Sequence, residues 1–183
     1  NAPALYENAD ASTLKGEGDG RVNILLVGKG GAGHPGGELT DTMLVLSIDT
    51  TQKQAAILSV PRDFYVKITG TNSYQKLNSA YELGKEKSNA KNADGKQADG
   101  IKSLDDTLSP VLGIPIQYYV MFDFNAYKEL VDIVGGVDIH LDNAIYDPNF
   151  DWQYGRNSLK LPAGNVHLNG TTALLLGRAR GAA

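Results

Sequence analysis

The sequence predicts a single domain of mixed α/β class, and three observations carry that prediction. Its 183 residues leave room for one domain and not comfortably for two. Hydrophobic residues make up 42% and charged residues 21%, as in ordinary globular proteins, which excludes disorder for the chain as a whole. Apolar runs of strand length alternate with amphipathic segments in the order β-β-β-α-α-β-α-β-α. That order is typical of helices that cover a central sheet.

The first third of the chain predicts three strands. Residues 21–27, 43–48 and 54–60 are short apolar runs, of which the first stops at Gly28 and the third at Pro61. The polar link between the second and third runs is short enough for a hairpin. A glycine-rich loop joins the first two runs.

Helical spacing of apolar residues begins in the middle of the chain and returns near its end. We expect helices over residues 77–84, 101–112, 127–134 and from 171 onward, and strands over 118–122 and 137–141. The polar stretch 85–100 is interpreted as a solvated loop or frayed helix, and residues 142–164 as irregular.

Composition and charge exclude several functional classes. Lys plus Arg number 17 and Asp plus Glu 21, so the net charge is −4, which argues against a nucleic-acid partner. The absence of Cys excludes disulfide scaffolds, thiolate zinc sites and cysteine nucleophiles. Three widely separated histidines argue against a multi-histidine metal site. Residues 1–20 lack a hydrophobic period and end in a Gly and acidic run, which predicts a flexible tether.

The glycine-rich loop imitates a dinucleotide-binding fingerprint. Residues 28–33 satisfy G-x-G-x-x-G directly after a predicted strand. The fingerprint requires a helix at its third glycine and a crossover to a parallel strand. The segment between Gly33 and Met43 is too short for such a crossover. We therefore expect a flexible loop near a ligand rather than a nucleotide site.

Seven short segments, taken in order, resemble the LytR-CpsA-Psr family of bacterial cell-wall phosphotransferases. Each is weak alone, since a Pro-Arg-Asp tripeptide means little, but their order makes the resemblance specific. The matching segments are residues 23–28, 40–43, 58–63, 76–81, 119–124, 130–137 and 168–180. Together they cover the chain from about residue 21 to its end.

The resemblance implies an α/β/α sandwich with a central mixed sheet around a hydrophobic tunnel that binds a polyprenyl chain. Members of this family move a glycopolymer from a polyprenyl-pyrophosphate carrier to peptidoglycan on the extracytoplasmic face of the cell membrane, usually with Mg²⁺. They are normally anchored by an N-terminal membrane helix. On this basis we expect residues 1–20 to be the tether from a missing anchor. Residues 21–183 are then the catalytic domain, truncated at its C-terminus.

Cleavage of a pyrophosphate concentrates negative charge on oxygen, so it calls for fixed positive charge, which arginine supplies best. The resemblance implies the site residues: Arg62, Arg178, Arg180 and Asp63 for catalysis, Lys76, Lys29 and Asn78 for the substrate phosphates, and Asp41 for the metal. Plainer interpretations exist for each kind. An arginine is commonly a surface residue or complements a helix end, and a lone aspartate commonly caps a turn. Aromatic residues near 119–124 suit either a lipid tunnel or a core.

Two positions depart from the family pattern. Lys29 stands where many members carry a second metal-binding aspartate, and Leu39 where many carry an arginine. Our hypothesis is that Lys29 supplies positive charge and weakens the dependence on Mg²⁺. Two other functions remain open: a polyprenyl-pyrophosphate pyrophosphatase, and a non-catalytic binder of polyprenyl phosphates, which these two departures favour.

Overall fold

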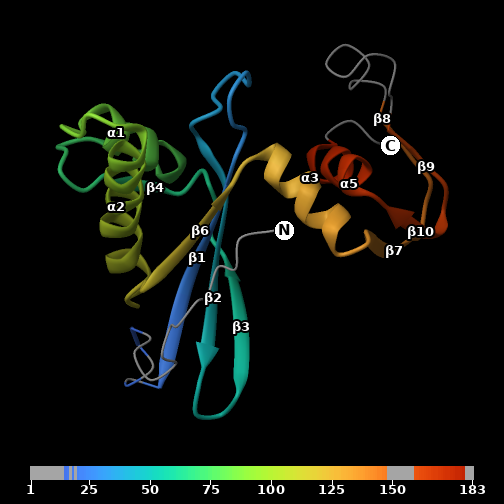
Figure 1. The fold of residues 1–183 in the computed structure, drawn as a ribbon, viewed down its shortest axis with the longest axis horizontal. Helices are drawn as coiled ribbons and strands as arrows, with labels where there is room; N and C mark the ends of the chain where they lie inside the picture. Colours follow the sequence, from blue (N-terminus) through green and yellow to red (C-terminus); the bar gives the residue numbers. More distant parts are fainter. Residues whose placement is uncertain (1–14, 17, 19, 148–158, 180–183) are drawn as a thin grey trace. The chain divides into compact units, whose positions relative to one another are not determined.

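The computed structural model describes residues 15, 16, 18, 20–147 and 159–179. The chain divides into two compact units, residues 1–121 and 122–183, and each is treated by itself below. Both contain helices and strands, so the predicted mixed α/β class is confirmed (Figure 1). Among the described residues no helix combines the length and the apolar character needed to cross a membrane.

The first unit is built on a four-stranded sheet. Its strands are β1 (Arg21–Lys29), β2 (Thr40–Asp49), β3 (Gln54–Ser59) and β6 (Tyr118–Phe122), in the order β3-β2-β1-β6. β2 runs antiparallel to both β1 and β3. The three strands predicted from the first third of the chain are therefore present, and the predicted β2–β3 hairpin is confirmed. An antiparallel β1–β2 pair also excludes the crossover that a dinucleotide fingerprint requires.

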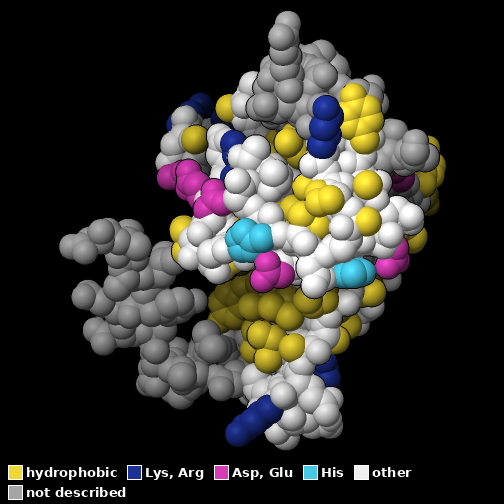
Figure 2. Space-filling model, turned by 90° about the vertical axis from the view of Figure 1, so that its right-hand side faces the viewer, with side chains coloured by type: hydrophobic (Ala, Val, Ile, Leu, Met, Phe, Trp, Pro, Cys, Tyr) yellow, Lys and Arg dark blue, Asp and Glu magenta, His cyan; other side chains and the backbone are white. Residues whose placement is uncertain are grey.

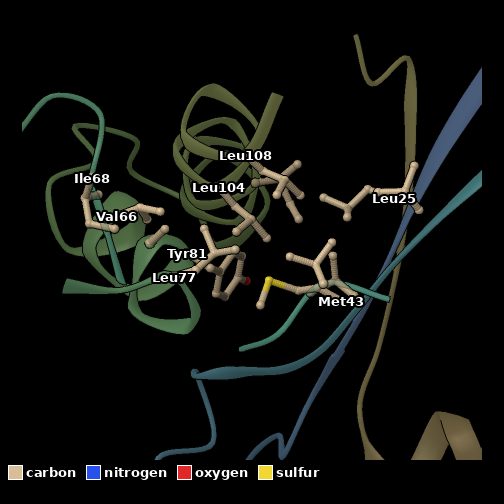
Figure 3. Packing of buried hydrophobic residues seen from close by; sticks show 13 residues of the cluster. Leu25, Met43, Val66, Ile68, Leu77, Tyr81, Leu104 and Leu108 are labelled. Atoms are coloured by element: carbon tan, nitrogen blue, oxygen red, sulfur yellow. The ribbon is translucent and has the colours of Figure 1, made fainter. Parts of the chain in front are cut away.

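One face of this sheet forms the core together with α1 (Ala80–Glu86) and α2 (Ala93–Leu112). Leu25 lies opposite Val45 and Val27 opposite Met43 in the antiparallel register, so all four side chains share one face. Each is no more than 1% exposed. Figure 3 shows Tyr81 of α1 and the leucines of α2 pointing toward Leu25 and Met43 from the helical side. Alternation along the strands thus positions β1 and β2 against the helix pair.

The polar stretch 85–100 is more ordered than the sequence indicated, which corrects its interpretation as a loop or frayed helix. α2 begins at Ala93, where the Asn92 side chain caps it by accepting a hydrogen bond from Gly95 N at 2.9 Å. A Cβ on Gly100 would lie 2.7 Å from the Tyr81 ring, so a glycine is needed where the two helices approach. The cap and this close packing hold a segment whose composition is polar.

A short hairpin follows β3 and was not predicted. β4 (Tyr65–Lys67) pairs with β5 (Tyr74–Lys76), and the 3₁₀ helix η3 (Leu77–Ser79) follows at once. The rings of Tyr65 and Tyr74 stack at 6.1 Å between centroids. Val66 and Ile68 enter the core on the other side. The hairpin returns the chain to the end of β3, which matters for the site below.

The second unit packs two helices against two small antiparallel sheets. The helices are α3 (Phe124–Ile133) and α5 (Gly170–Arg178). The sheets pair β7 (Val137–Leu141) with β10 (Gly164–Leu168), and β8 (Ile145–Asp147) with β9 (Leu159–Leu161). The described parts of residues 142–164, expected to be irregular, therefore contain strands. A Cβ on Gly170 would lie 2.1 Å from Lys128 O, so glycine permits the close contact of α3 with α5.

The β7–β10 sheet carries two polar cross-strand pairs. His167 Nδ1 lies 2.8 Å from Asp138 Oδ1, and His140 Nδ1 lies 2.7 Å from Asn165 Oδ1. These four residues line one open pocket on the sheet. Figure 2 shows a face of the molecule on which histidine side chains lie beside acidic ones. Each histidine thus contacts a side chain of the opposite strand, and the described residues do not bring the histidines together as metal ligands.

Candidate functional site

Four charged residues of the first unit form a continuous chain of ion pairs, which we call the arginine cluster. Arg62 Nη1 lies 2.9 Å from Asp41 Oδ1, and Arg62 Nε lies 3.6 Å from Asp63 Oδ2. Lys76 Nζ lies 2.6 Å from the other oxygen of Asp63. All four were selected from the sequence, and the structure brings them together. Their formal charges sum to zero.

Asp41 reaches this cluster because β2 carries a bulge. Gly28 pairs with Thr42 and Lys29 pairs with Thr40, so Asp41 is the extra residue that opposes no partner on β1. Thr40 and Met43 are buried while Asp41 and Thr42 face outward. The bulge therefore keeps both flanking residues in the core and directs the Asp41 carboxylate to the surface. Asp41 lies inside a strand and does not cap a turn.

Backbone hydrogen bonds position Arg62 relative to Lys76. β3 ends before Pro61, and a turn follows in which Phe64 N donates to Pro61 O at 3.1 Å. Asn78 N donates to Arg62 O at 3.1 Å, and Thr40 Oγ1 donates to Asn78 O at 3.2 Å. Through these two hydrogen bonds the main chain of Asn78, which is 8% exposed, connects η3 to Arg62 and to β2. Its predicted role in phosphate binding stays a prediction.

The side chains of the cluster are open to solvent, and its cations favour the ionised form of Asp63. The hydrogen bond from Lys76, with the charges of Lys76 and Arg62, lowers the pKa of Asp63 below its ordinary value. The Arg62 and Asp41 side chains are each 40% exposed, and Lys76 is 62% exposed. The guanidinium and ammonium groups are thus reachable by an anion in solution, and a guanidinium binds phosphate oxygens in pairs.

Lys29 lies in a different contact set, which includes two residues that the sequence did not indicate. Its Nζ lies 3.3 and 3.2 Å from the two carboxylate oxygens of Glu38. Lys85 Nζ lies 2.5 Å from Glu38 Oε2. Both ammonium groups stand over the Tyr81 ring, 5.3 and 5.5 Å from its centroid. We call Lys29 and Lys85 the lysine pair.

The carboxylate between these lysines is held ionised. Partial burial acts to raise the pKa of Glu38, but the hydrogen bonds and charges of Lys85 and Lys29 outweigh it and lower that pKa. Burial raises the pKa of the Tyr81 phenol beneath them. No local sequence signal joins Glu38 to Lys85, because 47 positions separate them.

The second unit holds one of the two other predicted arginines. Arg178 is the last residue of α5, and its guanidinium carbon lies 4.6 Å from the centroid of the Phe124 ring. That geometry is a cation–π contact, and a cation in a last helical turn also complements the helix dipole. Arg180 lies outside the described residues.

The described residues fit a metal ion only in part. Within them no group of three or more His, Cys, Asp or Glu side chains is arranged to hold one. Arg62 stands between the two carboxylates of the arginine cluster. Asp41 can therefore offer Mg²⁺ a single carboxylate, with a bound phosphate supplying further oxygens, which is a common way for proteins to hold this ion.

Comparison with known proteins places these residues in a family context. The sequence model of the LytR_cpsA_psr family matches residues 3–183. The polyisoprenyl-teichoic acid–peptidoglycan teichoic acid transferase TagU of Bacillus mycoides is 31% identical over 159 residues, which are 87% of this chain and 44% of that protein. The TagU protein of Enterococcus faecalis is 32% identical over 120 residues, 66% of this chain and 35% of its own length. This chain thus spans less than half the length of these curated relatives.

Solved structures agree on the fold. TagV of B. subtilis superposes with a TM-score of 0.68 at 28% identity, covering 87% of this chain and 56% of TagV. TagT with bound octaprenyl pyrophosphate lipid superposes with a TM-score of 0.67 at 24% identity, covering 97% of this chain and 61% of TagT. The predicted fold, a mixed α/β architecture with a central sheet, is therefore confirmed.

Proposed function

Because the chain belongs to the LytR-CpsA-Psr family, we propose that it is part of a phosphotransferase that moves a glycopolymer from a polyprenyl-pyrophosphate carrier to peptidoglycan. The TagU relatives are named for transfer of teichoic acid to peptidoglycan, and a TagT structure holds a polyprenyl pyrophosphate. The single observation in this chain that carries the proposal is the arginine cluster, which exposes Arg62 and Lys76 at the end of the sheet.

In the proposed reaction an acceptor hydroxyl oxygen attacks the phosphorus that carries the glycopolymer. A new phosphorus–oxygen bond forms to the acceptor, and the bond from that phosphorus to the bridging oxygen breaks. Polyprenyl phosphate leaves with the bridging oxygen, and the hydroxyl proton passes to water. Charge builds up on the phosphate oxygens during this displacement, so fixed donors that meet those oxygens lower its barrier.

The two aspartates are proposed as positioning residues for Arg62. They contact two of its three guanidinium nitrogens, Nη1 and Nε, and so fix the plane of the group. A planar fork held in this way meets two phosphate oxygens at once with less loss of side-chain entropy. Lys76, tied to Asp63, would bind the phosphates as a second cation. Arg178 and Arg180 are kept as proposed catalytic residues on the resemblance.

Asp41 is the proposed ligand of Mg²⁺, with the pyrophosphate contributing most other oxygens. When bound, the ion would neutralise charge on the pyrophosphate. We propose only a weak dependence on it, because Lys29 stands where many family members place a second aspartate.

The lipid tunnel and the cellular location also remain proposals. The first unit has a small pocket of about 70 Å³, lined by Leu25, Ile101 and Tyr119 among others. That volume suits about two water molecules and is too small for a polyprenyl chain.

We propose that the protein acts at the extracytoplasmic face of the membrane, where lipid-linked glycopolymer and peptidoglycan meet.

The test is a transfer assay with a lipid-linked glycopolymer and peptidoglycan, comparing the 183-residue chain with its Arg62→Ala variant. We expect product on peptidoglycan, and a rate about 100-fold lower for Arg62→Ala, the scale of one lost donor to a developing oxyanion. Arg21→Ala is the matched control. Arg21 also forms an ion pair with an aspartate, Asp49 at 3.0 Å, but it begins β1, about 26 Å along that strand from Lys29.

The same assay separates the alternatives. Cleavage of the pyrophosphate without acceptor, and no product on peptidoglycan, would identify a pyrophosphatase. Tight binding of the lipid without turnover would identify a non-catalytic binder. Equal rates for Arg62→Ala and Arg21→Ala would overturn the proposed site.

A further inference from the structure

The lysine pair has the geometry of an anion site whose occupant is part of the protein. Glu38 Oε2 lies within 3.2 Å of both ammonium groups, so one oxygen bridges two cations. A phosphate oxygen bound between two lysines would make the same contacts. The Tyr81 ring, fully buried, supports both ammonium groups from below.

The exposure of the three side chains places the anion on the outside. Lys29 is 15% exposed and Lys85 27%, whereas Glu38 is 37% exposed. Of the three charged groups, the Glu38 carboxylate is therefore the most accessible to a ligand arriving from solvent.

Charge also favours a second cationic site. The arginine cluster is formally neutral, because its two aspartates balance Arg62 and Lys76. A pyrophosphate diester carries about two negative charges, whereas this cluster offers it no net positive charge. With Glu38 displaced, the lysine pair contributes two positive charges.

The two sites lie at the same end of one ladder. Lys29 pairs with Thr40 in the β1–β2 register, and Asp41 is the next residue of β2. Successive strand residues are about 3.3 Å apart, so the main chains of Lys29 and Asp41 are neighbours. The lysine pair and the arginine cluster are thus carried by adjoining backbone at one end of the β1–β2 ladder.

The loop that carries Glu38 is also held by backbone hydrogen bonds of its own. Gly31 N donates to Gly37 O at 3.0 Å, and Leu39 N donates to Gly36 O at 2.9 Å. Gly36 has a φ of +66°, a conformation that glycine adopts without strain. None of these features involves the Glu38 side chain, so they do not require its carboxylate to stay between the lysines.

We propose that the lysine pair is a second phosphate-binding site for the pyrophosphate of the substrate, and that the Glu38 carboxylate is its displaceable internal occupant. The proposal rests on the proposed function, which assigns the pyrophosphate to this end of the sheet. It adds Lys85 to the substrate contacts and gives Glu38 the role of a competitor.

The test is a calorimetric titration of the 183-residue chain with inorganic pyrophosphate, in EDTA and again with Mg²⁺. We expect Glu38→Gln to tighten binding and Lys85→Met to weaken it, each by about three- to fivefold, the range of a partly exposed ion pair. Both effects should persist in EDTA, because lysines need no metal. Lys102→Met, which breaks an exposed ion pair with Asp106 at 2.6 Å, is the control and should change affinity less than about twofold.

Unchanged or weaker binding by Glu38→Gln would overturn the proposal, since Glu38 would then only fasten the loop. Where thermal unfolding shows that Glu38→Gln is not folded, Glu38→Asp serves instead. It keeps the charge but reaches less far, and a gain smaller than that expected for Gln supports the proposal while a loss overturns it. Arg62→Ala in the same titration distinguishes a failure of the proposed function from a failure of this inference. If it leaves affinity unchanged the proposed function fails, whereas a loss with Arg62→Ala and no gain with Glu38→Gln overturns this inference alone.

Discussion

The arginine cluster and the lysine pair both hold cations next to carboxylates, but they do so in different surroundings. Arg62 is held by two aspartates at the surface, and the set is neutral and exposed. Lys29 and Lys85 share one carboxylate above a buried ring, and that set keeps one net positive charge. Exposed pairs contribute little to stability, while groups seated on the core depend on its packing. The arginine cluster should therefore govern chemistry, and the lysine pair should respond to both chemistry and folding.

The strongest way to break this comparison is to remove the support of the lysine pair. Tyr81 is fully buried, so we expect Tyr81→Ala to lower the free energy of unfolding by about 3–5 kcal/mol in urea denaturation. Its hydroxyl has no hydrogen-bond partner among the described residues, so Tyr81→Phe should be neutral or stabilising. Tyr65→Ala, at a position 69% exposed, is the control. If Tyr81→Ala costs no more than Tyr65→Ala, the lysine pair does not stand on the core.

A smaller effect is expected on the transfer rate, for which the loss of Lys29 is compared with the removal of Mg²⁺. We expect Lys29→Ala to slow glycopolymer transfer about tenfold, near 1.4 kcal/mol, because a cation facing the phosphates is lost. Chelation of Mg²⁺ by EDTA should slow the wild-type protein by less than that. The measurement is the transfer rate with and without EDTA for both proteins. An intact rate in Lys29→Ala, together with loss of all activity in EDTA, would contradict a charge-supplying role for Lys29.

The smallest effect is a pH dependence. The folded-state pKa of Glu38 is lowered from 4.5, so its ion pairs stabilise the folded protein above that pH. This contribution is lost as the pH falls below 4.5 through the folded-state pKa. Because Glu38 is partly exposed, we expect at most about 1 kcal/mol between wild type and Glu38→Gln at neutral pH. Urea denaturation from about pH 7 to 3 checks whether the two curves converge in acid. A constant difference would mean that charge is not the cause.

Periodicity predicted most of the fold because most elements have one clean apolar face. β1, β2 and β3 were found from their apolar runs, and the end of α2 from Gly113, which has a φ of +68°. The first turns of α2 were missed, because their order comes from the Asn92 cap and from packing at Gly100. The β4–β5 hairpin was missed because three-residue strands are too short to show a period.

The candidate site divides in the same manner. Asp41, Arg62, Asp63 and Lys76 lie in segments that resemble a family, and the structure gathers them. Their roles in the reaction stay predictions. Glu38 and Lys85 had no such signal, because only the fold of the glycine-rich loop against α1 brings them together. Lys29 was singled out from the sequence as a departure from the family pattern, but the sequence could not reveal that the acidic side chain of Glu38 binds it.

The bulge at Asp41 changes how the side-chain directions in the two parts of β2 are related. In a regular strand a change of one residue turns every following side chain to the other face. Thr40 and Met43 are three positions apart, so in a regular strand their side chains would face opposite sides. Because Asp41 is an extra residue between them, both side chains point inward. Deletion of Asp41 would leave Thr40 and Met43 two positions apart, the spacing at which a regular strand turns both side chains to one face. The exposed carboxylate can therefore be removed from the strand without reversing the face that packs in the core.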